Sequence, residues 1–247
     1  DCLLSRGLGD VYKRQFEDLS LTEQKNRSFE WIYSQALKRF SSPADFEANL
    51  PTPLSKRVLL ARSDADYLSI MCRRVFRAGL QHKMVDAKWP AFEKACFGFN
   101  PRALAALSDE GLEDILQADG IIRHWGKLKS IRTNAVMVDD LAQTHGSFAR
   151  WLVDWPSDDV VGLCFELKRQ GAHLGGHSAQ RFLRMAGIDT FLLTDDTVAV
   201  LIGLGVVDRP PTSKAALREV QSVFNNWAIE SGRPLCEISR TVSFLAG

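Results

Sequence analysis

Residues 163–186 read LCFELKRQGAHLGGHSAQRFLRMA and contain the clearest structural signal in the chain. The leucines that open this stretch recur at helical spacing, and Gly171 is placed to end that helix. Gly175 and Gly176 predict a tight turn, because glycine reaches backbone angles that other residues avoid. Residues 178–186 then predict a second helix. The stretch as a whole predicts a helix-hairpin-helix.

A glycine hairpin of this kind has a physical use in binding DNA. It exposes backbone N–H groups beside a helix N-terminus, where a phosphate can approach closely and meet the positive end of the helix dipole. Gly171, Gly175 and Gly176 are therefore candidate contacts to the DNA backbone. Two helices joined by a glycine-rich turn are common in helical proteins, so the hairpin alone does not establish DNA binding.

The rest of the chain predicts an all-α fold. Apolar residues recur at helical spacing almost everywhere, and no run alternates with the period of a strand. Helices are expected at about 66–79, at about 91–97, from Ser108 to Gly120, and from Pro210 to Gly232. Proline residues are expected at helix starts or in loops.

Charge is unevenly distributed, although the formal net charge of the 247 residues is only +1. Residues 67–85, 120–138 and 167–188 carry several bases and no acids, whereas acids gather in 108–119. One face of the molecule can therefore be positive, as a phosphate-binding protein requires. The alternative is that these segments are ordinary solvated helix faces.

Composition excludes several classes of protein. Apolar residues make up 45% and charged residues 25%, without any apolar run long enough to span a membrane, and no repeat or low-complexity segment occurs. The five cysteines are widely spaced and lack a CxxC pair, which indicates a reducing, cytoplasmic setting. Residues 1–15 resemble translated adapter sequence and are expected to be an artefactual leader. Residues 16–247 are expected to form a single helical domain.

Three ordered blocks of the sequence resemble the 3-methyladenine DNA glycosylase I family. They are DADYLSIMCRRVFRAGLQHKMVDAKWPAFEKACFGFNP, LSDEGLEDILQADGIIRHWGKLKSIRTNA and LKRQGAHLGGHSAQRFLRMAG, and the resemblance covers most of residues 64–240. Its most specific phrase is GIIRHWGKLKSIRTNA. The resemblance implies the helix-hairpin-helix DNA glycosylase fold and a base-excision repair enzyme. Such an enzyme hydrolyses the N-glycosidic bond of 3-methyladenine in duplex DNA, without a cofactor and as a monomer.

The resemblance also implies a pocket for the extruded base, which stacks on aromatic or apolar side chains. Family members carry an acidic residue and a tryptophan at two base-contact positions, where this chain has Arg74 and His82. These differences leave the identity of the preferred base open. Trp125 and Trp89 are further candidates for the pocket, although most tryptophans serve only packing. The basic residues expected to bind DNA are Lys127, Lys129, Arg181 and Arg184.

A carboxylate that assists base departure is expected after the hairpin. The segment 192–207 resembles the part of the superfamily in which an aspartate acts on the deoxyribose, which implies Asp196 or Asp195 as the catalytic residue. Asp196 is favoured because a TxDxV arrangement is associated with this branch. The same residues also suit a helix N-cap and first turn, which needs no chemistry.

The family resemblance also implies a zinc ion held by cysteine and histidine from both chain ends. No such ligand set is found: Cys2 lies in the expected leader, and the residues after 177 offer only Cys236. No metal is therefore expected. Two other functions remain open: a non-catalytic helix-hairpin-helix protein that recognises DNA lesions, and a helical interaction protein that does not bind DNA.

Overall fold

The computed structural model describes residues 28–246, and this part of the chain is helical throughout, with no strand. The all-α prediction is therefore confirmed. The expected leader at 1–15 lies outside the described residues. Contacts divide the described chain into two compact units, which we call the central unit (54–157 and 162–188) and the terminal unit (28–53, 158–161 and 189–246). The single domain expected over residues 16–247 stays a prediction.

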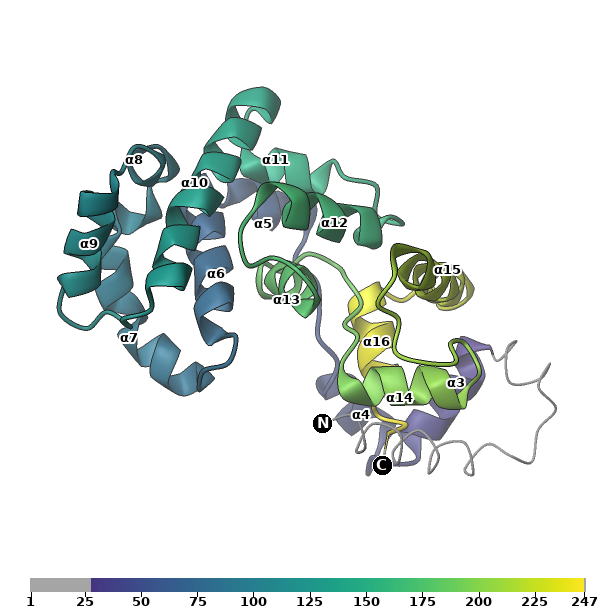
Figure 1. Ribbon diagram of the computed structural model, residues 1–247. Coiled ribbons are helices and arrows are strands. Elements are labelled where there is room, and N and C mark those ends of the chain that lie inside the picture. Colours follow the sequence, from purple (N-terminus) through teal and green to yellow (C-terminus); the bar gives the residue numbers. More distant parts are fainter. Residues whose placement is uncertain (1–27, 247) are drawn as a thin grey trace. The chain divides into compact units, whose positions relative to one another are not determined.

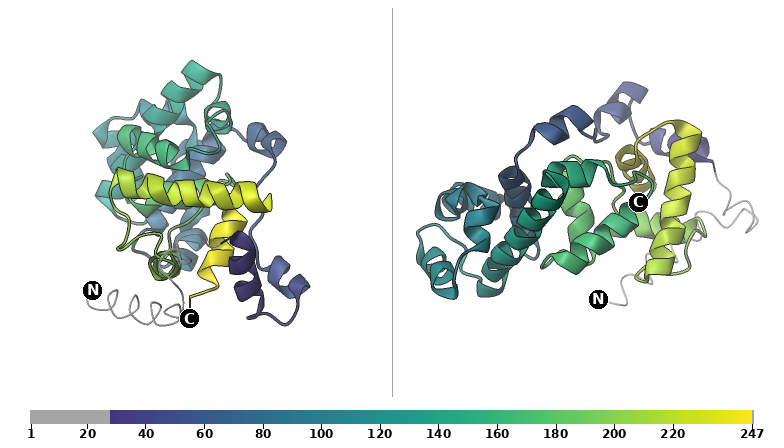
Figure 2. Two further views of the ribbon diagram at one scale, coloured as in Figure 1. Left: turned by 90° about the vertical axis from the view of Figure 1, so that its right-hand side faces the viewer. Right: turned by 90° about the horizontal axis from the view of Figure 1, so that it is seen from above.

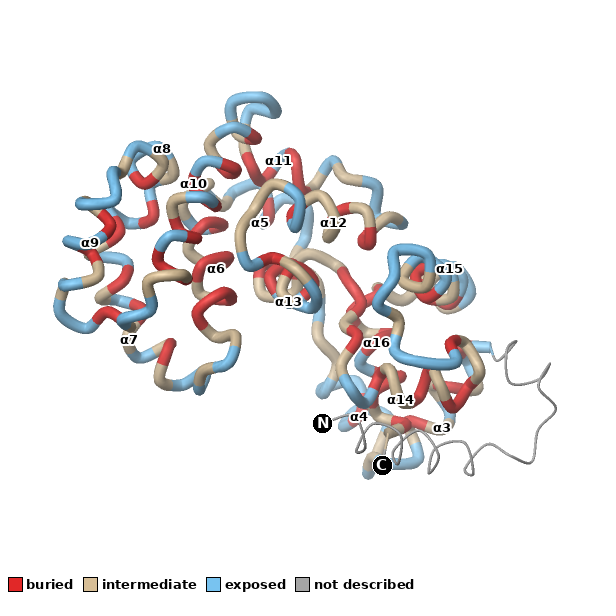
Figure 3. The backbone as a smooth tube through the Cα atoms, viewed as in Figure 1, coloured by how far each residue is buried: buried red, intermediate tan, exposed pale blue. Residues whose placement is uncertain are grey.

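The central unit contains most of the helices (Figure 1). They are α5 (Lys56–Ala61), α6 (Asp64–Arg77), α7 (His82–Ala95), the 3₁₀ helix η1 (Phe97–Phe99), α8 (Pro101–Ala105), α9 (Asp109–Gln117), α10 (Trp125–His145), α11 (Phe148–Val153), α12 (Val160–Gln170, from Gly162 onward) and α13 (His177–Met185). The long helix α10 packs against α6, α8 and α11, and α13 packs against α6 (Figures 1 and 2). The helices bury their apolar sides against one another, which Figure 3 shows as buried inner faces.

Local signals explain where these helices begin and end. Ser63 caps α6 through a capping box with Asp66, and Ser108 caps α9 by accepting a hydrogen bond from the Gly111 N–H. The long α10 ends at Gly146, which adopts a left-handed conformation with φ 83°. The helices predicted at about 66–79 and after Ser108 are confirmed.

For the helix predicted at about 91–97, the predicted first residue is wrong. The helix α7 begins at His82, and Pro90 lies inside it rather than at its first turn. A proline in a helix interior removes one backbone hydrogen bond. Here the apolar residues on both sides of it, Val85, Trp89 and Phe92, are buried in one core, which holds the helix together through the proline.

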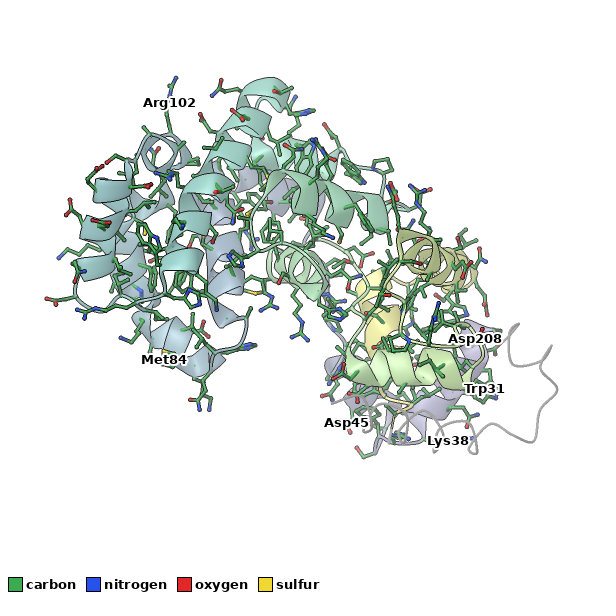
Figure 4. All side chains as sticks on the ribbon, in the orientation of Figure 1. Trp31, Lys38, Asp45, Met84, Arg102 and Asp208 are labelled. Atoms are coloured by element: carbon green, nitrogen blue, oxygen red, sulfur yellow. The ribbon has the colours of Figure 1, made fainter. Side chains whose placement is uncertain are left out.

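The terminal unit consists of α3 (Phe29–Leu37), α4 (Pro43–Ala48), α14 (Asp195–Gly203), α15 (Lys214–Ser231) and α16 (Leu235–Ser243). The helix α15 matches the one predicted near the C-terminus and ends at Gly232 in a left-handed conformation. In Figure 4, Lys38 and Asp45 extend outward from this unit. Both residues are exposed.

Candidate nucleic-acid interface

The hairpin predicted at 171–176 is present between α12 and α13 in the central unit. The helix α12 ends at Gln170, and the Gly171 N–H donates to the Leu167 carbonyl at 2.9 Å. Leu174 is buried and fixes the turn to the core, whereas Gly176 is exposed. Gly176 has φ 55° and ψ −132°, which a residue with a side chain avoids. The helix-hairpin-helix is therefore confirmed, with its turn at the surface.

Asn134 of α10 holds the hairpin in place, and the sequence did not single it out. Its side chain is fully buried. Its Oδ1 accepts from the Ala172 N–H at 2.7 Å, and its Nδ2 donates to the Ala172 carbonyl at 3.2 Å. The side-chain amide of Asn134 thus forms hydrogen bonds with both the N–H and the carbonyl of Ala172. A polar residue on the buried side of a helix was the signal that could have found it.

Replacing Asn134 by alanine is expected to destabilise the protein by about 2 kcal/mol, because the Ala172 backbone loses both partners. The affinity for DNA should fall with it, since the hairpin is no longer held. Urea unfolding measures the first effect and fluorescence anisotropy the second. Thr133→Ala is the matched control, because Thr133 is exposed and bonds only to its own helix. Equal stability of the two variants would contradict the role of Asn134.

The start of α13 is open to an anion. No side chain caps this helix, and its first turn carries no acidic residue. The Ser178 N–H donates to the Gly175 carbonyl at 3.1 Å, and the exposed residues Gly176 and His177 lie at the positive end of the helix dipole. The Lys168 side chain lies next to Gly175, and Arg181 is exposed one turn into the helix. This arrangement suits a phosphate group.

Lys127 and Lys129, the two basic residues of α10 that are predicted to bind DNA, differ in their surroundings. Lys129 is exposed, and its Nζ lies 5.5 Å from the centre of the Trp125 ring. Lys127 is buried, and its Nζ donates to the carbonyls of Phe76 at 3.1 Å and Ala78 at 2.5 Å. Burial lowers the pKa of Lys127. Its present partners give it a structural role at the end of α6.

The residues predicted for the base pocket differ in their surroundings. Trp89 is only 2% exposed, stacks on Phe92 and Phe99, and donates from Nε1 to Ser69. It is a core residue. His82 is exposed at the first position of α7. Trp125 is half-buried at the start of α10.

Arg74, the remaining candidate, is buried to 8% exposure on the last turn of α6. Burial, and then the charges of Arg181 and Arg77, hold the pKa of its guanidinium below the ordinary value. A cavity of about 600 Å³ lies elsewhere on α6, and Ser69, Arg73 and neighbouring residues line it. None of the four predicted pocket residues is among those that line this cavity.

Asp195 and Asp196 lie at the first two positions of α14 in the terminal unit. Both are exposed. Thr194 caps the helix by accepting from the Thr197 N–H at 3.2 Å. Two acids in the first turn complement the helix dipole. The predicted capping role is confirmed, and the catalytic role stays a prediction.

Within residues 28–246, no group of three or more histidine, cysteine or acidic side chains is placed to hold a metal ion. The described residues thus do not fit the zinc site that the family resemblance implies. The cysteines of this part of the chain are free thiols, and Cys72, Cys96 and Cys236 are buried. In the same residues, no helix is both long enough and apolar enough to cross a membrane.

The buried thiols predict how stability changes with pH. Burial raises the pKa of Cys96 from 9.0 in the unfolded chain to about 12 in the folded protein, and burial also raises that of Cys72. The stabilising contribution of such a thiol is complete below pH 9 and is lost as the pH rises towards 12, because only the unfolded chain ionises there. Urea midpoints measured between about pH 8 and 11 should therefore fall less steeply with rising pH in Cys96→Ala than in the wild type. Parallel slopes in both proteins would contradict this.

Several solved structures are similar to this chain. A crystal structure of 3-methyladenine DNA glycosylase I is 23% identical, with coverage of 60% of this chain and 90% of that chain and a TM-score of 0.46. A structure of 3-methyladenine DNA glycosylase I from Staphylococcus aureus is 19% identical, with coverage of 63% of this chain and 91% of that chain and a TM-score of 0.47. The structure of the Methanocaldococcus jannaschii 8-oxoguanine glycosylase/lyase in complex with 15mer DNA containing 8-oxoguanine is 16% identical. It covers 95% of this chain and 96% of that chain, with a TM-score of 0.49.

A comparison with curated proteins gives no significant match. Residues 59–169 match the model of the methyladenine glycosylase family. The matched segment runs from within α5 into the last turn of α12 and includes Asn134, whereas the hairpin follows directly after it. This part of the chain, most of which lies in the central unit, is therefore similar to the methyladenine glycosylase family.

Proposed function

We propose that this chain is a DNA glycosylase that hydrolyses the N-glycosidic bond of 3-methyladenine in duplex DNA. The observation that carries the proposal is the exposed hairpin, whose uncapped helix N-terminus stands directly after a segment of the methyladenine glycosylase family. The hairpin binds a phosphate beside the lesion through its backbone N–H groups. Arg181, Arg184 and Lys129 add positive charge, which attracts the DNA backbone.

Hydrolysis of this glycosidic bond requires few catalytic groups from the protein besides those that bind the DNA. The damaged base has to leave the stack, at a cost of a few kcal/mol that is smaller for a damaged base. Trp125 supplies an aromatic surface on which the extruded base can stack. A base that already carries a positive charge is a good leaving group. A carboxylate then stabilises the positive charge that develops on the sugar and orients water, and Asp196 or Asp195 is proposed for this role.

Release of free base tests the proposal. Duplex DNA that contains 3-methyladenine is incubated with the protein, the free base is measured by mass spectrometry, and the abasic sites are measured as alkali-labile breaks. We expect both products in equal amounts, because one glycosidic bond is broken for each base released. Undamaged duplex should give neither. Absence of both products at saturating protein concentration would reject the glycosylase proposal.

A second function, recognition of lesions without cleavage, is favoured by one observation. Asp195 and Asp196 are exposed in the first turn of α14, after the capping residue Thr194. Their favourable interaction with the helix dipole explains both carboxylates without a catalytic role. Such a protein would bind duplex DNA through the hairpin and release no base. Its affinity would still fall steeply with salt, because phosphate contacts displace condensed counterions. A salt-dependent affinity without base release would therefore select this second function.

The proposal extends to the setting in which the protein works. We place it in the cytoplasm as a monomer, without a cofactor, bound to duplex DNA that contains alkylated bases. Free thiols suit a reducing compartment. Size-exclusion chromatography with light scattering measures the state of association, and a stable dimer would correct this part of the proposal.

A further inference from the structure

A cluster of basic side chains lies where the end of α6 meets α13 and the start of α10. We call it the Arg74 cluster, and it consists of Arg74, Arg77, Lys127 and Arg181. Three of these side chains are largely buried, whereas Arg181 is exposed and marks the side from which a ligand can approach. Arg77 reaches α13 directly, with its Nη1 3.7 Å from the Met185 Sδ.

Arg74 has no partner among the described residues. Its Nε is buried and makes no hydrogen bond. No carboxylate of residues 28–246 forms an ion pair with its guanidinium. A buried charge without a partner is costly, so proteins pair such groups or keep them for a ligand.

The surroundings of Arg74 add to this cost. The charges of Arg181 and Arg77 disfavour its own charge, and the charge of Arg74 in turn disfavours that of Lys127. Asp86 is the acid beside this cluster, and it is already used: it accepts from the Arg77 Nε at 2.9 Å and lies 3.5 Å from Arg73. The cluster therefore has a large excess of positive charge.

We infer that the Arg74 cluster binds a second phosphate of the DNA backbone, separate from the phosphate at the hairpin. A guanidinium donates two parallel hydrogen bonds to phosphate oxygens, and a phosphate carries the full negative charge that this excess requires. An uncharged base offers only partial charges. A cationic base would be repelled. The inference rests on the proposed binding of DNA.

Spacing along α13 agrees with a backbone phosphate. Arg181 follows Gly176 by five residues, which is about 7.5 Å along a helix. Successive phosphates of one strand advance by about 3.4 Å along the DNA axis. Arg181 is thus close enough to the hairpin for phosphates of one strand to contact both.

Arg74→Met tests the inference, because methionine keeps most of the length and removes the charge. The slope of log affinity against log salt for duplex DNA should become shallower by about 0.9, as expected for one lost phosphate contact, with affinity down about tenfold. The loss should be equal for damaged and undamaged duplex. Arg102→Met is the matched control, since Arg102 is exposed on α8 and extends into solvent (Figure 4).

Two results of the binding measurement would overturn the inference. One is an unchanged salt slope in Arg74→Met. The other is a loss confined to damaged duplex, which would mean that Arg74 contacts the base. Thermal unfolding without DNA separates a structural role: Arg74→Met should unfold at the same or a higher temperature than the wild type, because it removes an unpaired buried charge. A lower unfolding temperature that accounts for the lost affinity would also overturn it.

Inorganic phosphate provides a measurement that does not depend on base release. Phosphate should raise the unfolding temperature of the wild type more than that of Arg74→Met, compared with chloride at equal ionic strength. This difference together with an inactive wild type would reject the glycosylase proposal and leave the phosphate site standing. Equal stabilisation of both proteins would reject the phosphate site while base release is judged separately.

Discussion

Replacing Asp196 by asparagine is expected to slow the release of 3-methyladenine roughly 10²- to 10⁴-fold, if this carboxylate stabilises the positive charge on the sugar. Asparagine keeps the size of the side chain and removes its charge. The first-turn position costs less than about 1 kcal/mol of helix stability, so the fold should survive. Single-turnover rates at saturating protein concentration measure the chemical step and not the binding.

Two further variants make this result specific. Asp195→Asn should slow release far less if Asp196 is the catalytic residue, and the order is reversed if Asp195 acts. Asp208→Asn is the matched control, because Asp208 is exposed, lies in the same unit after α14 (Figure 4) and should leave the rate unchanged. If neither Asp195→Asn nor Asp196→Asn slows release, the carboxylate assignment is wrong, although the glycosylase proposal survives.

Replacing Gly171 by alanine is expected to destabilise the hairpin. A Cβ at this position would lie 2.6 Å from the Leu174 Cδ1, 2.9 Å from the Asn134 Oδ1 and 3.0 Å from the Leu167 carbonyl oxygen. Two of these neighbours are fixed, because one is backbone and the other clamps Ala172. Gly171→Ala should therefore cost about 1–3 kcal/mol of stability through overpacking, and should reduce DNA affinity at least about tenfold.

Gly126→Ala is the control for this variant. A Cβ there meets only the His124 ring at 3.6 Å, which is ordinary contact, and alanine favours the first turn of α10. Its stability should equal or exceed that of the wild type. Urea unfolding and fluorescence anisotropy of both variants decide the matter. A Gly171→Ala protein with wild-type stability and affinity would show that the hairpin does not need glycine at this position.

Local sequence signals were enough to predict much of the fold. Ser108 with two acids after it, and Gly232 after a long apolar stripe, define helix ends through caps that depend only on neighbouring residues. The hairpin followed from Gly171, Gly175 and Gly176 for the same reason. Pro90 misled the prediction, because the core around α7 outweighs the local preference of proline.

The site was harder to predict, because its residues depend on contacts between helices far apart in the sequence. Asn134 lies 38 positions from the backbone that it holds. Lys127 looked like a DNA contact, yet it donates to carbonyls at the end of another helix. The burial of Arg74 beside Arg181 arises only when α6 packs against α13. No local pattern in the sequence carries this information.

The hairpin between α12 and α13 is proposed to bind a DNA phosphate. Heteronuclear NMR of the backbone amides during titration with duplex DNA tests it most directly. We predict that the largest shifts occur at the amides of Gly175, Gly176 and His177, and that they decrease as salt is added. Unshifted hairpin amides at a DNA concentration that saturates binding would contradict the claim.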